Sequence, residues 1–284
     1  MKKYETFLKY LKRFVLYPFV ALVVLFGISL AVVNIITRPS NNRNWSNDQK
    51  ILPFAETNHN LILIHNIRNF KYSSTASYTE DYYDKVFDIN TIKRAWFVVE
   101  PFSKIPGPAH TFISFEFEDN QFVSISVEIR KEKGESFNPL KGLFNQYELM
   151  YVIADERDVI KLRSNYRHDL VYVYPIRATK EKAGALFLNM IARANVLKEN
   201  TEFYNTITSN CTTKLVNHIN AISPGRVPSF SIQAILPKFS DALAYKLGLL
   251  DTNLTLAQAR ERFLVNDKAK KYASDENFSV KIRN

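Results

Sequence analysis

The sequence predicts an α+β protein with one N-terminal membrane-spanning helix. An uncharged apolar run extends over residues 14–36, apolar residues then recur with period two up to about residue 174, and the period changes to 3.6 from Thr179. Strands followed by helices favour an antiparallel sheet with C-terminal helices over a doubly wound parallel sheet. A composition of 46% hydrophobic and 13% aromatic residues can fill the core of one large domain or two small ones.

Residues 1–13 form a basic head that precedes the apolar run. The run is long enough to cross a bilayer, which takes roughly 20 residues. It exceeds the apolar core of a cleavable signal, about 7–15 residues, so we expect an uncleaved anchor. Five basic residues precede the run, and only Arg38 and Arg43 follow it closely. The positive-inside rule therefore predicts a single-pass protein with a cytoplasmic N-terminus and everything after about residue 38 on the other side.

The charge and composition narrow the classes of partner. The formal charge is +10, of which the head contributes +4 and the remainder +6. That remainder indicates either contact with anionic lipids or a merely solvated basic surface. No basic run with interleaved aromatic residues suggests nucleic-acid binding. The sequence has no phosphate-binding glycine loop, no Gly-x-Ser-x-Gly elbow and no metal-ligand spacing, so we expect neither a cofactor nor a metal.

The first part of the domain is predicted to be a sheet. Residues 37–60 read as a linker and residues 61–284 as the domain, with a polar loop over residues 72–83. The expected strands cover residues 61–67, 95–100, 111–117, 122–129, 149–154, 159–163 and 170–174. Residues 118–121 read as the turn of a hairpin, and residues 155–158 as a second turn.

Helices are predicted for the second part. A stripe of Leu186, Phe187, Met190, Ile191, Ala194 and Leu197 follows the N-cap candidate Thr179 and ends near Asn200. Further helices are expected over residues 211–219, 240–247 and 256–273, with prolines between the first two. The last of these begins with the capping-box spacing of Thr255 and Gln258.

The only cysteine of the chain, Cys211, is the first candidate for chemistry. Leu215, Val216 and Ile219 recur behind it as an amphipathic stripe, so Cys211 lies in the first turn of a helix with Ser209 or Asn210 as N-cap. A helix N-terminus lowers a thiol pKa and favours the nucleophilic thiolate. The alternative is that Cys211 is a small buried apolar residue.

A histidine elsewhere in the chain supplies the matching base. His110 opens a strand directly after the Pro/Gly-rich turn that includes Gly107. A strand-end histidine and a helix-start cysteine form the usual pair of a thiol acyl-transfer site. His218 shares the helix of Cys211 but lies roughly 10 Å along it, so we interpret it as a surface or packing residue.

Strand register predicts a third group. The apolar faces of the two hairpin strands must coincide, which places Glu128 on the same face as His110. A three-residue loop that pairs Glu118 with Phe122 would put Glu128 diagonal to His110. We therefore expect Glu128 to orient the imidazole, with Ser126 and Glu116 as alternatives. An exposed Glu128 that pairs with a neighbouring basic residue is the structural alternative.

Four segments carry a family resemblance: Ala109-His-Thr-Phe-Ile-Ser-Phe115, Ser126-Val-Glu-Ile-Arg-Lys-Glu-Lys-Gly134, Tyr151-Val-Ile-Ala-Asp-Glu-Arg-Asp158 and Phe203-Tyr-Asn-Thr-Ile-Thr-Ser-Asn-Cys-Thr-Thr213. On them the chain resembles the Lnb N-terminal periplasmic domain family, whose named member is a lipoprotein N-acyltransferase. The resemblance implies a circularly permuted papain-like (NlpC-type) fold, His110 as base and Cys211 as nucleophile. It also implies a periplasmic domain on the bacterial inner membrane.

The predicted reaction is acyl transfer through a Cys211 thioester, with lipoprotein N-acylation as the form that the resemblance implies. Backbone N–H groups around Asn210 and Thr212 are expected to stabilise the oxyanion. The expected partners are membrane lipids with lipoprotein N-termini, or cell-wall peptides. The alternatives are a papain-like cell-wall peptidase or amidase, and a non-catalytic membrane-tethered binding module.

Overall fold

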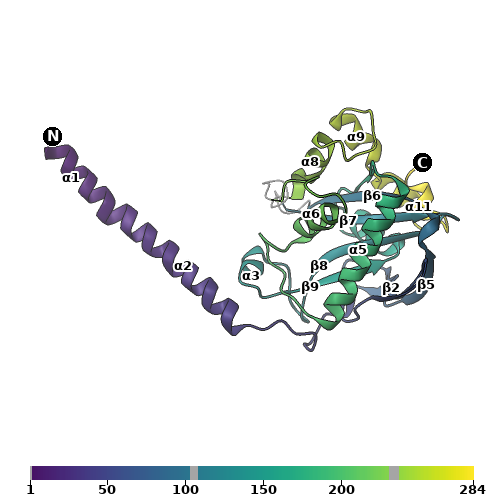
Figure 1. Ribbon diagram of the computed structural model, residues 1–284, viewed down its shortest axis with the longest axis horizontal. Coiled ribbons are helices and arrows are strands. Elements are labelled where there is room, and N and C mark those ends of the chain that lie inside the picture. The colour runs from purple at the N-terminus through teal and green to yellow at the C-terminus, as the bar shows by residue number, and fades with distance from the viewer. Residues whose placement is uncertain (1, 103–107, 230–236) are drawn as a thin grey trace.

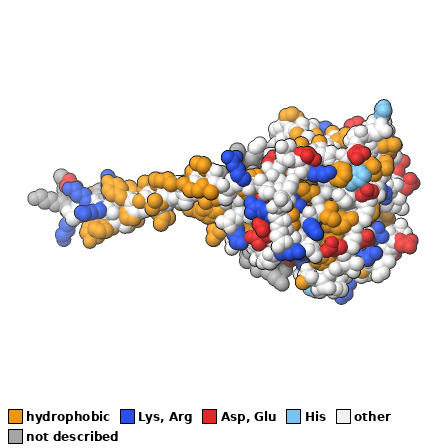
Figure 2. Space-filling view, turned by 90° about the horizontal axis from the view of Figure 1, so that it is seen from below, with side chains coloured by type: hydrophobic (Ala, Val, Ile, Leu, Met, Phe, Trp, Pro, Cys, Tyr) orange, Lys and Arg blue, Asp and Glu red, His pale blue; other side chains and the backbone are white. Residues whose placement is uncertain are grey.

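The computed structural model describes residues 2–102, 108–229 and 237–284. The part of the predicted Pro/Gly turn that includes Gly107 lies outside these residues. A long N-terminal helix projects from a globular domain (Figure 1). The helix comprises α1 (Lys2–Leu11), a π-helical turn (Lys12–Leu16) and α2 (Tyr17–Ile36), and by length and composition it can cross a membrane. Apolar side chains cover it, and basic side chains gather toward its far end (Figure 2).

Eight of the described strands form one sheet in the order β1-β2-β9-β8-β7-β6-β10, with β5 also paired to β2. These strands are β1 (Phe54–Asn58), β2 (Leu61–Arg68), β5 (Tyr82–Asp88), β6 (Ile92–Pro101), β7 (Ala109–Phe117), β8 (Phe122–Arg130), β9 (Glu148–Ala154) and β10 (Tyr172–Pro175). The pairs are antiparallel except for a short parallel contact between β2 and β9. The predicted α+β class with an antiparallel sheet is confirmed.

Helices cover both faces of the sheet. On one face α5 (Lys180–Glu199) and α6 (Cys211–Ile222) pack on the inward side chains of β7, β8 and β9 (Figure 1). The predicted stripe of α5 is buried there, between the N-cap Thr179 and the C-cap Asn200. On the other face lie α4 (Glu156–Lys161), a π-helical turn (Leu162–Tyr166), α10 (Asn266–Lys271) and α11 (Phe278–Lys281). The remaining α-helices of the described residues are α3 (Pro139–Leu143), α8 (Ser240–Lys246) and α9 (Leu256–Phe263).

The domain begins earlier than predicted. Strand β1 and the buried side chain of Trp45 belong to the folded unit, although both fall within the segment 37–60 that the sequence suggested as a linker. Trp45 is only 5% exposed, and its backbone bridges to Glu132. The predicted loop over residues 72–83 is also partly wrong. It contains a small hairpin of β3 (Lys71–Tyr72) and β4 (Tyr78–Thr79) and the start of β5.

Two predicted elements have a different structure. The expected strand 159–163 is helical, because the Asp155 carboxylate caps the segment by accepting from the Arg157 N–H, and Val159 and Ile160 pack on the second face of the sheet. A short apolar run cannot be assigned to strand or helix by its period alone. The expected helix 256–273 divides into α9 and α10, although its Thr255 capping box is present.

The hairpin of β7 and β8 has the predicted faces but another register. Phe112 pairs with Ser126 and Glu116 with Phe122, a shift of two residues from the predicted alignment. The cause lies in the turn, where Asp119 and Asn120 both have φ of 55° and the Phe117 N–H donates to the Gln121 carbonyl. A shift of two residues keeps each side chain on its face. It moves Glu128 from diagonal to directly across from His110 when the register is continued.

Candidate active site

Cys211 is the first residue of α6, as predicted. The N-cap is Asn210, whose side chain accepts from the Thr213 N–H, while the Thr213 hydroxyl accepts from the Asn210 N–H at 2.9 Å. This reciprocal capping box fixes the start of the helix and so the position of the thiol. Cys211 is 7% exposed, which agrees with the apolar residues that pack around its helix.

The first turn of α6 lies against the start of β7, which carries His110. The hydroxyls of Thr111 and Thr212 are 3.0 Å apart and join the two elements. Beside this contact the Cys211 thiol and the His110 ring line the same cavity, close enough for each to shift the pKa of the other. The two residues that the sequence selected, 101 positions apart in the chain, therefore meet in the fold.

The pair is electrostatically coupled. Burial raises the pKa of the Cys211 thiol, but its interaction with His110, with a smaller contribution from Thr111, more than offsets this and lowers it to about 7. For His110, burial lowers the pKa, whereas its interactions with Cys211 and Glu128 raise it to about 9. Around neutral pH this arrangement favours a thiolate next to an imidazolium, the reactive form of a cysteine nucleophile.

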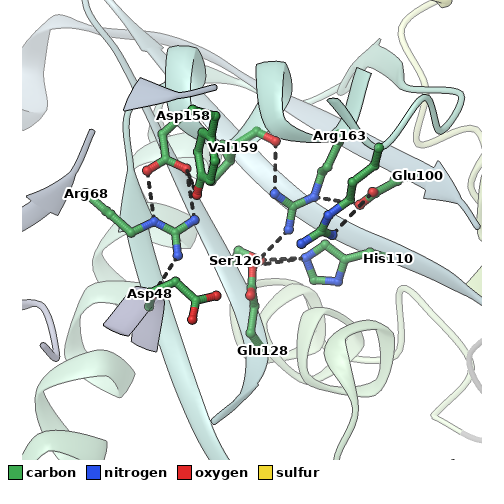
Figure 3. A network of polar contacts seen from close by, with 11 residues as sticks. Asp48, Arg68, Glu100, His110, Ser126, Glu128, Asp158, Val159 and Arg163 are labelled. Carbon is green, nitrogen blue, oxygen red and sulfur yellow. Dashed lines mark hydrogen bonds and ion pairs between the residues drawn. The ribbon is translucent and has the colours of Figure 1, made fainter. Parts of the chain in front are cut away.

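A serine connects the histidine to the predicted carboxylate (Figure 3). His110 Nε2 lies 2.6 Å from the Ser126 Oγ, and the Ser126 hydroxyl donates to Glu128 Oε1 at 2.9 Å. Glu128 Oε1 is itself 3.6 Å from His110 Nε2. Because the serine hydrogen points to Glu128, the serine oxygen accepts the Nε2–H of the ring, which leaves Nδ1 for the thiol. Glu116, the other alternative, lies elsewhere and accepts from the Trp96 indole N–H at 2.9 Å.

Arg163, which sequence reasoning missed, forms an ion pair with the Glu128 carboxylate. Its guanidinium donates to Glu128 Oε1 at 2.9 Å and to Glu100 Oε2 at 2.6 Å (Figure 3). Arg163 is 2% exposed and Glu100 is fully buried. Burial alone would raise the pKa of Glu128, but His110 and Arg163 hold it well below its usual range. Arg163 reaches Glu128 from the π-helical turn over Leu162–Tyr166. The prediction of a strand over residues 159–163 is wrong at this position.

The predicted oxyanion groups require one correction. The backbone N–H of Asn210 is engaged in the capping box and cannot serve a substrate in this conformation. The N–H groups of Cys211 and Thr212 occupy the first two helical positions, where an α-helix offers no backbone acceptor. They are the N–H groups of this turn that can face a developing oxyanion.

A cavity of about 350 Å³ opens beside the pair. Its walls include Cys211, His110 and Glu128, and the apolar side chains of Phe137, Ile129 and Tyr204. Lys131, Arg163 and Arg167 add positive charge. The cavity is large enough for an extended substrate and joins an apolar wall to a reactive thiol.

The other predicted positions lie away from this cavity. His218 is buried within α6, where its ring nitrogens contact Tyr151 and Asn189, and burial lowers its pKa to about 4. It is a packing residue. Within residues 2–102, 108–229 and 237–284, no group of three His, Cys, Asp or Glu side chains is arranged to hold a metal ion.

Comparison with known proteins gives one family. Residues 78–238 match the family described as Lnb N-terminal periplasmic domain, a region that covers more than half of the chain and contains His110, Glu128, Arg163 and Cys211. No curated protein and no solved structure matches the chain.

Proposed function

The chain belongs to the Lnb N-terminal periplasmic domain family, and from this premise we propose that it is a membrane-anchored thiol acyltransferase. The family and the apolar N-terminal helix make it a membrane-anchored protein with a periplasmic domain. The observation that carries the proposal is the placement of Cys211 and His110 together at the wall of one largely apolar cavity. The order of strand histidine before helix cysteine is compatible with a permuted papain-like arrangement.

The reaction begins at an ester carbonyl. The Cys211 thiolate attacks the carbonyl carbon, and the N–H groups of Cys211 and Thr212 stabilise the oxyanion. The C–O bond then breaks, the leaving alcohol takes the proton of the His110 imidazolium, and a thioester remains on Cys211. In the second half an amine attacks the thioester while neutral His110 accepts its proton. The C–S bond breaks, and the products are an amide and the restored thiolate.

The residues behind His110 keep its ring ready for both halves. The chain of hydrogen bonds from Nε2 through Ser126 to Glu128 fixes one tautomer and one ring orientation. The negative charge of Glu128 stabilises the imidazolium, and Arg163 keeps that carboxylate ionised. Positioning of this kind is the role that an orienting third group has in related thiol sites.

The anchor supports an acyl donor from the membrane. Helix α2 ends at Ile36, and only residues 37–44 separate it from Trp45, which is buried in the domain. The first residue of α3, Pro139, lines the Cys211 cavity. Figure 1 shows α3 on the side of the domain that faces α2. A cavity tethered so close to the span meets lipid acyl esters at a high effective concentration.

Intact-protein mass spectrometry tests the proposal. The purified full chain in bilayers of phosphatidylethanolamine and phosphatidylglycerol should gain the mass of one acyl chain on Cys211. A lipopeptide with a free N-terminal amine should then remove the adduct and become N-acylated. His110→Gln should abolish adduct formation, whereas His65→Gln, which changes a histidine outside the site, should retain it. Cleavage of cell-wall peptides that depends on Cys211, without any acyl adduct, would replace the proposal with a peptidase.

A further inference from the structure

A second cavity lies on the other side of the first turn of α6. It has a volume of about 120 Å³ and is enclosed by α5, α6, α8 and the sheet. Its walls are almost entirely aliphatic, with Ile113, Leu215, Ile219, Leu243 and Leu247 among them. None of the described residues that line it is acidic.

This cavity adjoins the proposed catalytic centre. Thr212 lines it, whereas the preceding residue Cys211 lines the first cavity. The contact between the hydroxyls of Thr111 and Thr212 lies at this boundary. A ligand in the second cavity would therefore lie within a few residues of the thiol without occupying the same space.

One polar atom in the wall has no partner. The Ser240 hydroxyl is buried, with the residue only 4% exposed, and forms no hydrogen bond in the part of the chain that the structure describes. A buried hydroxyl without a hydrogen-bond partner destabilises the folded protein, because it has lost its hydrogen bonds to water. A hydrogen bond to an oxygen of a ligand would remove this penalty. Ser240 is therefore an unused donor in an otherwise apolar wall.

The rim carries positive charge. Arg177, Lys182 and Arg226 all line the cavity and are exposed to solvent. Arg177 lies 3.5 Å from the exposed Asp251, and Arg226 donates to the Leu247 carbonyl. A largely apolar cavity with a cationic rim matches a molecule that has an apolar tail and an anionic head.

We propose that this cavity binds one fatty acyl chain whose anionic head lies at the rim formed by Arg177, Lys182 and Arg226. Ser240 donates to an oxygen of the ligand. Since about 10–15 Å³ of such volume hold one water, a cavity of about 120 Å³ has room for roughly 8–12 atoms of that size. That the bound fatty acyl chain is a donor or product of the reaction at Cys211 rests on the proposed function. That the cavity binds a fatty acyl chain does not.

Photolabelling of a Cys211→Ala full chain separates binding from catalysis. The protein in phosphatidylcholine nanodiscs is exposed to dodecanoic acid with a diazirine near the end of the chain, and labelled peptides are mapped by mass spectrometry. We expect labels on α6 and α8, at residues such as Ile219 and Leu243. Labels confined to α2, or to Phe137 and Tyr204 of the first cavity, would overturn the inference.

Paired variants sharpen the test. Ile219→Trp fills the cavity and should reduce labelling of α8 about tenfold, the effect of losing roughly two buried methylene groups. Asn217→Trp, on the exposed side of the same helix, should leave labelling unchanged. Equal labelling of the two variants would contradict the site. Ser240→Ala should reduce labelling about threefold, as for loss of one hydrogen bond.

The rim is tested with substitutions that do not disturb the core. Lys182→Glu combined with Arg226→Glu should reduce labelling about fivefold, whereas Lys180→Glu should not. A dodecanol probe should be insensitive to the rim charges, and sensitivity equal to that of the acid would overturn the assignment of the head. A lysophosphatidylglycerol probe distinguishes a phosphate head from a free carboxylate. If the cavity is labelled but the wild-type protein forms no thioester on Cys211, the binding site is supported and only the proposed function is rejected.

Discussion

Arg163 donates to Glu128, with Nη2 2.9 Å from Oε1, the same carboxylate oxygen that accepts from Ser126. The contact is buried on the arginine side, where Arg163 is 2% exposed. His110 and Arg163 together keep Glu128 ionised, with its pKa well below the usual range, although burial opposes the charged form. Part of the stabilisation of the negative charge that faces His110 therefore comes from Arg163, which has no hydrogen bond to His110 or Cys211 among the described residues.

Loss of the Glu128 charge should slow acylation. Glu128→Gln keeps the shape of the side chain but removes the charge that stabilises the His110 imidazolium, so we expect the rate of adduct formation on Cys211 to fall by about 100-fold. Glu116→Gln is the matched control, since Glu116 lies on the same strand face as His110 but contacts Trp96. Full activity of the Glu128 variant would assign the orienting role to Ser126 alone.

The pH dependence of thiol alkylation reports the ion pair. The pKa of Cys211 is lowered to about 7, so the thiolate is present above that pH and is lost as the pH falls through it. The pKa of His110 is raised to about 9, so its positive charge is lost above that value. Alkylation of the folded protein by iodoacetamide should therefore rise through about pH 7, and acyl transfer should be fastest between about 7 and 9.

His110→Gln should move that alkylation midpoint upward. Burial raises the thiol pKa and His110 is the main group that lowers it, so without His110 the midpoint should exceed the ordinary value of about 8.5. The urea-unfolded protein supplies the reference for an unperturbed thiol. An unchanged midpoint in the variant would show that His110 does not activate Cys211.

Arg163 should also matter for stability. Arg163→Met leaves the buried Glu100 and the partly buried Glu128 without their arginine partner, so we expect the free energy of unfolding to fall by about 3–5 kcal/mol. Adding Glu100→Gln should recover part of the loss, because it removes the fully buried charge. Chemical denaturation of the full chain in detergent measures both.

Arg177→Met is the control for this effect, since its ion pair with Asp251 is exposed on both sides and should contribute less than about 1 kcal/mol. If the Arg163 variant were no less stable than the Arg177 variant, the buried ion pairs would not be structural. Recovery in the double variant distinguishes lost charge pairing from lost packing.

The parts of the site that depend on local signals could be predicted from the sequence. The apolar stripe behind Cys211 and the polar residues before it specify the start of α6, and the turn before His110 specifies the start of β7. Alternation along the hairpin strands predicted that Glu128 shares a face with His110, and the two side chains do lie close together. The alternation within each strand determines which side chains share a face of the sheet, and an error of two residues in the turn does not change it.

The parts that depend on non-local packing could not be predicted. The hairpin register depends on two residues with positive φ, Asp119 and Asn120, in a turn whose length the pattern left open. Arg163 reaches the site because the segment after Asp155 is helical, whereas its short apolar run fits a strand equally well. The second cavity lies between helices α5, α6 and α8 and strands β6 and β7, which are about 70 or more residues away in the sequence, and no local pattern indicates how these elements pack against one another.

The orientation of the anchor gives the last prediction. Five Lys and Arg residues precede the apolar run, so the N-terminus should remain in the cytoplasm and the domain should be periplasmic. In a Cys211→Ala background, Thr75→Cys in an exposed turn should react with a membrane-impermeant maleimide at the periplasmic face of intact spheroplasts. Tyr4→Cys in the basic head should react only after lysis. Replacing the five basic residues with Gln should make the labelling of both positions mixed, because the charge difference that sets the orientation is lost. Equal labelling of both positions before any charge is changed would reject the orientation, and with it access of Cys211 to periplasmic substrates.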